Sequence, residues 1–560
     1  MRAPSKGSAP PKAGAPPDPV QAALDSRLGT LLLALAVFLS ALAVFWGTRA
    51  YAFLNWDDKI YVVTNPWIQA IRWENVQAIF TRPYFQNFLP LHLLSYMLDH
   101  AIWGGNAGGY HLTSVLIHAL NSVLCLFVVR RLSGDALTGL VAALLFAVHP
   151  AHVEAVAWVS IRKDVLSTTF LLLSLWSYLQ ARRGDTLRLI PYLASCAWFL
   201  LGMLSKVSVA PLPAFLLVLD RMPEGKAGRG KTVPWLRALG SKIPYAVIAA
   251  PLILLNSHAQ VTAQAAYAHE PIGYLAVKGH AVWNYLALLF GREGNPDYDL
   301  PSIAPSFAAT TIELAGLLAL PLLAYLLFRW KRRLEFLGVV WVFLTLLPAL
   351  LFPLVTYMAD RYLYAPSIGF CWAIAAALGE AGAWRRWPAH APRALAAGAV
   401  ALALLLGFTL RTLSYSKVWK DSESLWTFAV TKSRDYRAFN NLADVRMQQK
   451  RWDEAERLLR RAATVENVTS YQSLGVLYYD LARYDEALRA TDRAIEIQAK
   501  KRRDPVLEAE LHFNRGAILW QEGQRARAVE EWRTAITLDP GHAQAREWLR
   551  TAGSPQPQPP

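Results

Sequence analysis

Long apolar runs recur from the N-terminal region to about residue 410, and they constrain the fold more than any other feature of the sequence. The first run, Leu28 to Trp46, contains no charged side chain. About 20 apolar residues in a helix cross the hydrocarbon core of a bilayer. With 54% hydrophobic residues, the chain is also too apolar for an ordinary soluble protein. The runs therefore predict an all-α, polytopic membrane protein with a transmembrane helical bundle.

About eleven membrane-spanning helices are expected, and several of them need flanking residues to reach the required length. Their approximate ranges are 28–46, 112–129, 137–148, 165–180, 191–204, 207–219, 243–255, 312–328, 334–352, 367–378 and 394–410. The stretch 276–290 is also apolar. Counting it as a further span would move the later basic clusters to the other side of the membrane, so it is predicted to be interfacial or re-entrant.

Basic residues set the orientation of the bundle. The formal net charge is +16, but the basic residues fall in short clusters between apolar runs, which indicates membrane topology and not a nucleic-acid partner. These clusters lie at Arg130/Arg131, Arg182/Arg183, 221–242, 329–333 and Arg385/Arg386. The positive-inside rule assigns their side to the cytoplasm. The segments that then lie outside are 47–111, 149–163, 257–305, 356–367 and everything after residue 410.

The composition changes along the chain and predicts five parts. They are a disordered cytoplasmic tail rich in Pro, Ala and Gly (1–27), a transmembrane domain (28–411), a linker (412–435), a repeat domain (436–550) and a second disordered tail (551–560). The three cysteines, Cys125, Cys196 and Cys371, all lie inside apolar segments. They form neither a disulfide framework nor a CxxC metal motif.

Three self-similar units follow the last apolar run. They align on Ala455, Ala487 and Ala528, and small residues recur seven positions later at Ala462, Ala494 and Ala535. Gly475 and Gly516 occupy the first helix of their units. This spacing is typical of tetratricopeptide repeats, in which small residues mark the close approach of two antiparallel helices. We expect a short α-solenoid whose concave surface binds a protein or peptide.

Two adjacent carboxylates, Asp57 and Asp58, follow the first apolar run within the stretch Asn55-Trp56-Asp57-Asp58. Their distance from Trp46 places them at the outer membrane interface, where a charged side chain costs much less free energy than at the bilayer centre. Neighbouring side chains point in different directions, so we expect one carboxylate to meet a reacting group and the other to be structural. The alternative for the pair is a solvated loop with a capping aspartate.

Imidazole and charged side chains gather in the same predicted outer segments. His111 lies at the end of the first loop, and the next outer turn contains His149, His152, Glu154, Arg162, Lys163 and Asp164. His149, His152 and Glu154 do not form the HExxH arrangement of zinc enzymes, and Pro150 disturbs their helical register. No metal site is predicted there. Arg162 and Lys163, together with Arg361 in the outer segment 356–367, are suited to binding a phosphate, although each has a neighbouring aspartate with which to pair.

These motifs together resemble one family. The NWDD stretch, "GGYHLTSVLIHALN", "HPAHVEAVAWVSIRKDVLS", "MADRYLYAPSIG" and "WKDSESLW" before the repeats are similar to the GT-C class of membrane glycosyltransferases with C-terminal repeats. Within that class they resemble the TMTC-type relatives of protein O-mannosyltransferases and their bacterial counterparts. The resemblance covers about residues 28–545 and implies a GT-C-like catalytic domain, a polyprenyl- or dolichyl-phosphate-sugar donor, and an acidic pair in the first outer loop that matches Asp57 and Asp58.

Inverting sugar transfer needs a base within reach of the acceptor hydroxyl, and one aspartate suffices. Arg162, Lys163 and Arg361 would bind the phosphate that leaves, while His111, His149, His152 and Glu154 are further candidate substrate-binding residues. A divalent metal ion is compatible with this chemistry but not required, and no cofactor is expected. The expected partners are the lipid donor, membrane lipid and a protein acceptor held by the repeats.

Two non-catalytic functions remain alternatives at this stage: a transporter for lipid-linked sugars and a membrane-tethered repeat scaffold. Charges that gather on one face, and not along a path through the spans, favour the enzyme over the transporter. High Ala and Arg usage and compact loops favour a bacterial inner membrane, with the active site and C-terminus outside the cytoplasm. In a eukaryote the corresponding location would be the endoplasmic reticulum membrane.

Overall fold

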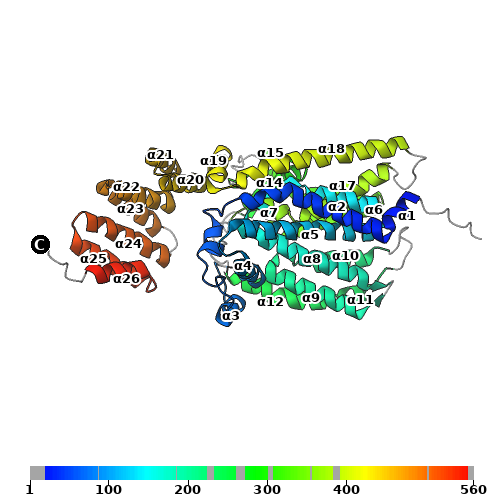
Figure 1. Cartoon of the computed structure of the whole chain (residues 1–560), viewed down its shortest axis with the longest axis horizontal. Coiled ribbons are helices and arrows are strands. Elements are labelled where there is room, and N and C mark those ends of the chain that lie inside the picture. The colour runs from blue at the N-terminus through cyan, green and yellow to red at the C-terminus, as the bar shows by residue number, and fades with distance from the viewer. Residues whose placement is uncertain are drawn as a thin grey trace, which may run out of the picture. The chain divides into compact units, whose positions relative to one another are not determined.

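The computed structural model describes residues 19–85, 87–183, 186–223, 232–259, 271–299, 307–352, 356–382, 391–500 and 504–552 (Figure 1). These residues fall into two compact units. The first contains residues 1–50, 61–294 and 302–416, and the second contains residues 51–60, 295–301 and 417–560. Most of the predicted tails 1–27 and 551–560, and the pair Arg385/Arg386, lie outside the described residues.

The first unit is a helical bundle. Its α-helices are α1 (Pro19–Asp25), α2 (Arg27–Phe45), α3 (Trp73–Thr81), α4 (Pro90–Trp103), α5 (Ala107–Ser133), α6 (Ala136–Ala147), α7 (Val153–Ala157), α8 (Arg162–Ala181), α9 (Leu189–Ser205), α10 (Leu212–Arg221), α11 (Trp235–Gly240), α12 (Ile243–Ala259), α14 (Pro271–Leu289), α15 (Phe307–Arg329), α16 (Arg333–Leu351), α17 (Pro366–Gly382) and α18 (Ala391–Ser416). Short 3-10 helices connect them: η1 (Trp46–Ala50), η3 (Pro150–His152), η4 (Val159–Ile161), η5 (Val207–Val209) and η7 (Asp360–Leu363). A π-helical turn, η2 (Lys59–Val63), precedes α3, and β1 (Arg182–Arg183) pairs with β2 (Thr186–Leu187) in a small antiparallel hairpin.

Six helices among the described residues are long and apolar enough to cross a membrane: Arg27–Ala50, Ala107–Ser133, Trp235–Ser257, Ala308–Arg329, Arg333–Leu351 and Ala391–Trp419. A seventh span results if α6 and the following helical segment Pro150–Ala157, bent by 51°, count as one broken span. The chain is therefore an all-α membrane protein, as expected, although the predicted number of eleven spans is not confirmed. Each predicted stretch nevertheless overlaps a helix.

The stretch predicted to be interfacial or re-entrant, 276–290, lies in α14, which is one unbroken helix. It packs closely on α15, because a β-carbon on Gly316 would lie 2.4 Å from the backbone oxygen of Gly279. Small residues at such crossings let two membrane helices approach each other. The position of α14 relative to the membrane stays a prediction.

Helices from two of the predicted outer segments, 47–111 and 149–163, lie at the same end of the first unit. In Figure 1, α3, α4 and α7 lie at one end of this bundle, and α1 and α11 lie at the other. Arg130 pairs with Asp25 at 2.9 Å, at the start of α2, and Lys242 pairs with Asp220 at 2.6 Å, before α12. Both ion pairs lie next to basic clusters that the sequence assigns to the cytoplasmic side. The orientation of the spans in the membrane stays a prediction.

The second unit begins with a short 3-10 helix, η9 (Lys417–Trp419), and continues through α19 (Ser422–Lys432), α20 (Tyr436–Gln448), α21 (Trp452–Ala462), α22 (Val468–Asp480), α23 (Tyr484–Ala499), α24 (Pro505–Gln521), α25 (Arg525–Leu538) and α26 (Ala543–Ala552). The six alanines that define the repeat pattern are at most 1% exposed. Helices α20 to α25 thus form three stacked helix pairs (Figure 1), as the repeat spacing predicts.

Gly516 shows why a small residue recurs in the first helix of a repeat. A β-carbon at this position would lie 2.4 Å from Nε1 of Trp532, whose ring is completely buried between α24 and α25. Replacing Gly516 by valine should destabilise the repeats by about 1–3 kcal/mol, because the added side chain would overlap the ring of Trp532.

Thermal denaturation followed by circular dichroism measures this loss as a lower transition temperature. Ala526→Val, at an exposed position of α25, is the matched control and should leave the transition within about 0.5 kcal/mol of the parent. A Gly516→Val protein as stable as the control would show that the helices do not pack this closely.

Candidate active site

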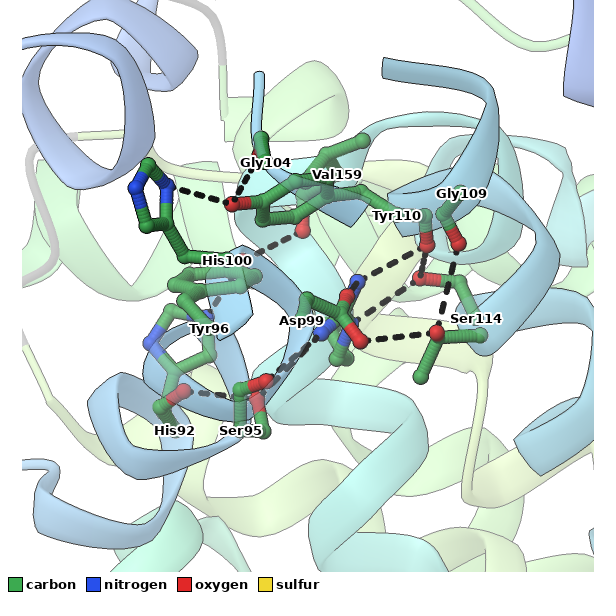
Figure 2. Close-up of polar contacts among 12 residues, drawn as sticks. His92, Ser95, Tyr96, Asp99, His100, Gly104, Gly109, Tyr110, Ser114 and Val159 are labelled. Atoms are coloured by element: carbon green, nitrogen blue, oxygen red, sulfur yellow. Dashed lines mark hydrogen bonds and ion pairs between the residues drawn. The ribbon is translucent and has the colours of Figure 1, made fainter. Parts of the chain in front are cut away.

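Arg162, the first residue of α8, contacts residues of α4 and α5. Figure 2 shows Tyr96 and Asp99 of α4 close to Tyr110 and Ser114 of α5. Its Nη2 lies 2.5 Å from a carboxylate oxygen of Asp99 and donates to the backbone oxygen of Tyr110 at 2.8 Å. Its Nε donates to Ser114 Oγ at 3.1 Å, and the guanidinium stacks over the ring of Tyr96. The Arg162 side chain is 0% exposed. This environment favours a structural role, in which Arg162 holds the loop helix α4 against the bundle.

Lys163, the next residue, faces a cavity of about 230 Å³ in the first unit. Lys206 from the turn before η5 and Arg361 from η7 line the same cavity, together with Asp164. Apolar side chains complete its walls, including Leu171, Val209, Ile253, Pro348, Ala349 and Phe352. We call this cavity the cation pocket. Three cations and one carboxylate line the cation pocket, and a second carboxylate, Glu154, pairs with Arg361. The remaining excess of one positive charge favours an anionic ligand with an apolar part.

Each cation of the pocket has a defined environment. Arg361 donates from its backbone N–H to Glu154 Oε2 at 2.8 Å, and its guanidinium contacts the other carboxylate oxygen. Burial opposes the charge of Arg361, but the Glu154 carboxylate outweighs this effect and raises the pKa of the guanidinium. Lys206 Nζ contacts Asp164 Oδ1 at 2.5 Å, and Lys163 Nζ lies 5.1 Å from the ring centre of Tyr61. Arg361 therefore stays charged in this setting.

The predicted histidines are buried in the bundle and do not line the cation pocket. His149 Nε2 donates to the backbone oxygen of Leu289 at 3.0 Å, while its Nδ1 accepts from the Ala151 N–H. His152 Nε2 lies 2.7 Å from Ser367 Oγ, and His111 is 1% exposed. These environments favour structural roles. No group of three or more His, Cys, Asp or Glu side chains within the described ranges is arranged to hold a metal ion.

Asp57 and Asp58 belong to the second unit. Asp58 is completely buried, and its Oδ2 accepts the backbone N–H of Leu54 at 2.9 Å, whereas Asp57 is partly exposed. The two carboxylates thus have different environments, one inside a turn and one open to solvent. These environments do not identify the carboxylate that reacts, so the assignment of the base stays a prediction.

The stretch that contains the acidic pair is joined to the start of the C-terminal helices. Asn55 N–H donates to Ser422 Oγ at 2.8 Å, and Asn55 Oδ1 accepts from Trp426 Nε1 at 2.7 Å. The side-chain amide of Asn55 also donates to Asp444 of α20 at 3.0 Å, and the rings of Trp56 and Trp426 lie 4.9 Å apart. Two motifs far apart in the sequence, NWDD and "WKDSESLW", therefore meet within one compact unit.

Sequence reasoning missed Asp99 and Lys206. Lys206 follows the predicted span 191–204 on the outer side, where the positive-inside rule expects few cations. This departure from the rule was a signal that could have identified Lys206. Asp99 interrupts the otherwise apolar face of α4, and a lone carboxylate there needs a buried partner. The sequence contains both signals, but it does not identify the residues that Asp99 and Lys206 contact.

Comparison with protein families gives matches in both parts of the chain. The family model described as dolichyl-phosphate-mannose-protein mannosyltransferase matches residues 90–259. Tetratricopeptide-repeat models match residues 437–465, 468–501 and 509–542. The first match contains Arg162, Lys163, Asp164 and Lys206, and the others cover the three predicted repeats.

Curated relatives extend over most of the chain. The protein O-mannosyl-transferase TMTC3 of Mus musculus is 23% identical over 454 residues, which are 72% of this chain and 47% of the relative. Human TMTC1, also a protein O-mannosyl-transferase, is 24% identical over 76% of this chain and 54% of the relative. Mouse TMTC2 is 40% identical over 117 residues, or 20% of this chain and 13% of the relative. The chain spans about half the length of these relatives, or less.

Among solved structures, the archaeal oligosaccharyltransferase AglB from Archaeoglobus fulgidus, in complex with an inhibitory peptide and a dolichol-phosphate, aligns with a TM-score of 0.41 and 11% identity. The alignment covers 76% of this chain and 59% of AglB. This likeness is too weak to establish the fold. The family and relative matches, in contrast, confirm the resemblance inferred from the motifs, to TMTC-type GT-C glycosyltransferases with C-terminal tetratricopeptide repeats.

Proposed function

We propose that the chain is a membrane glycosyltransferase that moves a sugar from a polyprenyl-phosphate carrier to a hydroxyl group of an extracytoplasmic protein. The observation that carries the proposal is the cation pocket, in which Lys163, Lys206 and Arg361 lie among apolar side chains. A lipid phosphate has the same combination of properties, an anionic headgroup on an apolar chain. The mannosyltransferase family match over residues 90–259 supports this donor class.

The pocket would bind the donor phosphate through Lys163 and Arg361. A phosphate oxygen held by a cationic donor forms a charge-assisted hydrogen bond, which is about twice as strong as a neutral one. The apolar walls lower the local dielectric constant, so these contacts are stronger than they would be in water. The same cations would stabilise the charge that develops on the phosphate as the glycosidic bond breaks.

Asp57 is the proposed base, because it is the partly exposed member of the acidic pair. Its carboxylate takes the proton of the acceptor hydroxyl, and the oxygen attacks the anomeric carbon of the sugar. The bond from that carbon to the phosphate oxygen breaks, and polyprenyl phosphate leaves with the electron pair. Asp58 holds the turn through the Leu54 N–H. No step requires a metal ion or cofactor, because a monophosphate leaving group is already stabilised by the basic side chains.

The repeats would select the protein acceptor. Stacked helix pairs present an extended surface that suits a peptide segment. Asn55 contacts both α20 and Trp426, so the acidic stretch is anchored to the same unit as the repeats. We place the active site and the repeats outside the cytoplasm, in a bacterial inner membrane or, in a eukaryote, the endoplasmic reticulum membrane.

Transfer of labelled mannose from polyprenyl-phosphate-mannose to protein, measured with the purified chain in proteoliposomes, tests the proposal. Lys163→Met should raise the KM for the donor by about 10- to 100-fold, because it removes a charge-assisted hydrogen bond worth about 1.5–3 kcal/mol. Lys163→Arg should restore most of the affinity. Arg329→Met, an exposed cation at the end of α15, is the control and should behave as the parent protein.

Two results would count against the proposal. If the folded parent protein transferred no sugar from any lipid-phosphate donor, the proposed glycosyltransferase function would be wrong. An unchanged donor KM in Lys163→Met, with transfer intact, would remove the cation pocket as the phosphate site.

A further inference from the structure

Asp164 of the cation pocket has an unused hydrogen-bonding oxygen. Its Oδ1 contacts Lys206 Nζ at 2.5 Å, but its Oδ2 is buried and accepts no hydrogen bond from the residues that the structure describes. The side chain is only 8% exposed, and the residue lines the pocket. A buried acceptor without a partner costs about 1–3 kcal/mol, so such a group calls for an explanation.

A purely structural role does not account for this oxygen. Asp164 is the third residue of α8, where the helix dipole favours a carboxylate. The other end of α8, however, shows what a structural pair in this bundle looks like. Asp220 contacts Lys242 at 2.6 Å, accepts from Tyr178 at 2.7 Å, and approaches Arg182 through its second oxygen at 3.4 Å. Asp220 Oδ1 accepts no hydrogen bond either, but the Arg182 guanidinium lies within ion-pair distance of it, whereas Asp164 Oδ2 has no such partner among the described residues.

The neighbours of Asp164 make one polar wall of the cavity. Ser167 and Thr168 follow on the same face of α8, and Lys163 precedes. Lys206 Nζ lies 5.4 Å from the ring centre of Tyr362, which also lines the pocket. An acceptor and a cationic donor side by side, next to the proposed phosphate site, match the alternating donors and acceptors of adjacent hydroxyl groups on a hexose.

We propose that Asp164 and Lys206 form a subsite for the hydroxyl groups of the transferred sugar. This inference rests on the proposed function, because it places the sugar beside the phosphate that Lys163 and Arg361 would hold. Asp164 Oδ2 accepts a hydrogen bond from one hydroxyl, and Lys206 donates to a neighbouring one. The pair therefore determines which sugar is accepted, since a site built to hydrogen-bond a hydroxyl rejects a donor that lacks it.

Binding of two lipids separates the sugar subsite from the phosphate site. The probes are polyprenyl phosphate, which has no sugar, and polyprenyl-phosphate-mannose, each titrated against the full-length protein in detergent. Asp164→Asn should weaken binding of the mannosyl lipid about tenfold or more, because it removes a charged acceptor. The same variant should bind the sugar-free lipid within about twofold of the parent, as expected for a group that does not touch the phosphate.

Two further variants keep the test decisive. Lys206→Gln should show the same selective loss, and it serves if Asp164→Asn does not fold. Asp220→Asn removes the matched buried Asp–Lys pair at the other end of α8 and should bind both lipids as the parent does, after its folding has been checked by gel filtration.

The sugar subsite would be overturned if Asp164→Asn and Lys206→Gln each weakened the binding of the two lipids equally, or left the binding of both unchanged. In those cases the proposed function would stand, because the parent protein still binds lipid phosphate. Failure of the folded parent to bind either lipid would overturn the proposed function, and the sugar subsite with it.

Discussion

Replacing Asp57 by asparagine is expected to lower the rate of sugar transfer by about 100- to 10,000-fold, the usual contribution of a positioned general base. Asparagine keeps the size of the side chain but cannot take the acceptor proton. The donor should still bind, since its proposed phosphate ligands are elsewhere. Single-turnover transfer at saturating donor concentration, with donor binding measured in parallel, separates a lost base from a lost substrate.

Asp58→Asn is the matched control within the acidic pair. Its remaining side-chain oxygen can still accept the Leu54 N–H, so the turn should form and transfer should fall much less than in Asp57→Asn. Loss of transfer only in Asp58→Asn would move the base to Asp58. Full transfer in both variants would end the assignment of the acidic pair as the base.

Replacing Asp99 by leucine should destabilise the bundle by about 3–5 kcal/mol, because it leaves the buried guanidinium of Arg162 without its carboxylate. The change removes the anchor between α4 and α8 and should lower both the yield of folded protein and the transition temperature in detergent. The effect is expected on folding and not on the chemistry of transfer.

The double variant Asp99→Leu/Arg162→Met provides the control. Removing both charges leaves no unpaired ion, so this protein should recover much of the stability lost in Asp99→Leu. A single variant as stable as the parent would show that the pair does not hold α4. A double variant less stable than Asp99→Leu would show that the other contacts of Arg162 dominate.

The helical class could be predicted because apolar runs and repeat spacing are local signals. The predicted number of spans is not confirmed, since helix length depends on breaks such as Pro150 and on polar side chains such as Ser167 and Thr168 in α8. These residues reduce the apolar character of α8, and they also line the cation pocket.

The candidate site was only partly predictable for a geometric reason. Lys163 and Arg361 line the cation pocket, as a phosphate-binding role requires, whereas Arg162 points into the bundle. Adjacent residues on a helix point about 100° apart, so the side chains of Arg162 and Lys163 point in different directions. One lies in the core of the bundle and the other lines the cavity. Which side chain went to the core depended on Asp99, a distant residue that no local pattern connects to α8.

The position of a bound donor in a cryo-electron microscopy structure tests the central claim most directly. The full-length protein with polyprenyl-phosphate-mannose should show the phosphate within hydrogen-bonding distance of Lys163 and Arg361, with the lipid chain along the apolar wall. A phosphate bound outside the cation pocket, with these side chains unoccupied by the donor, would contradict the account.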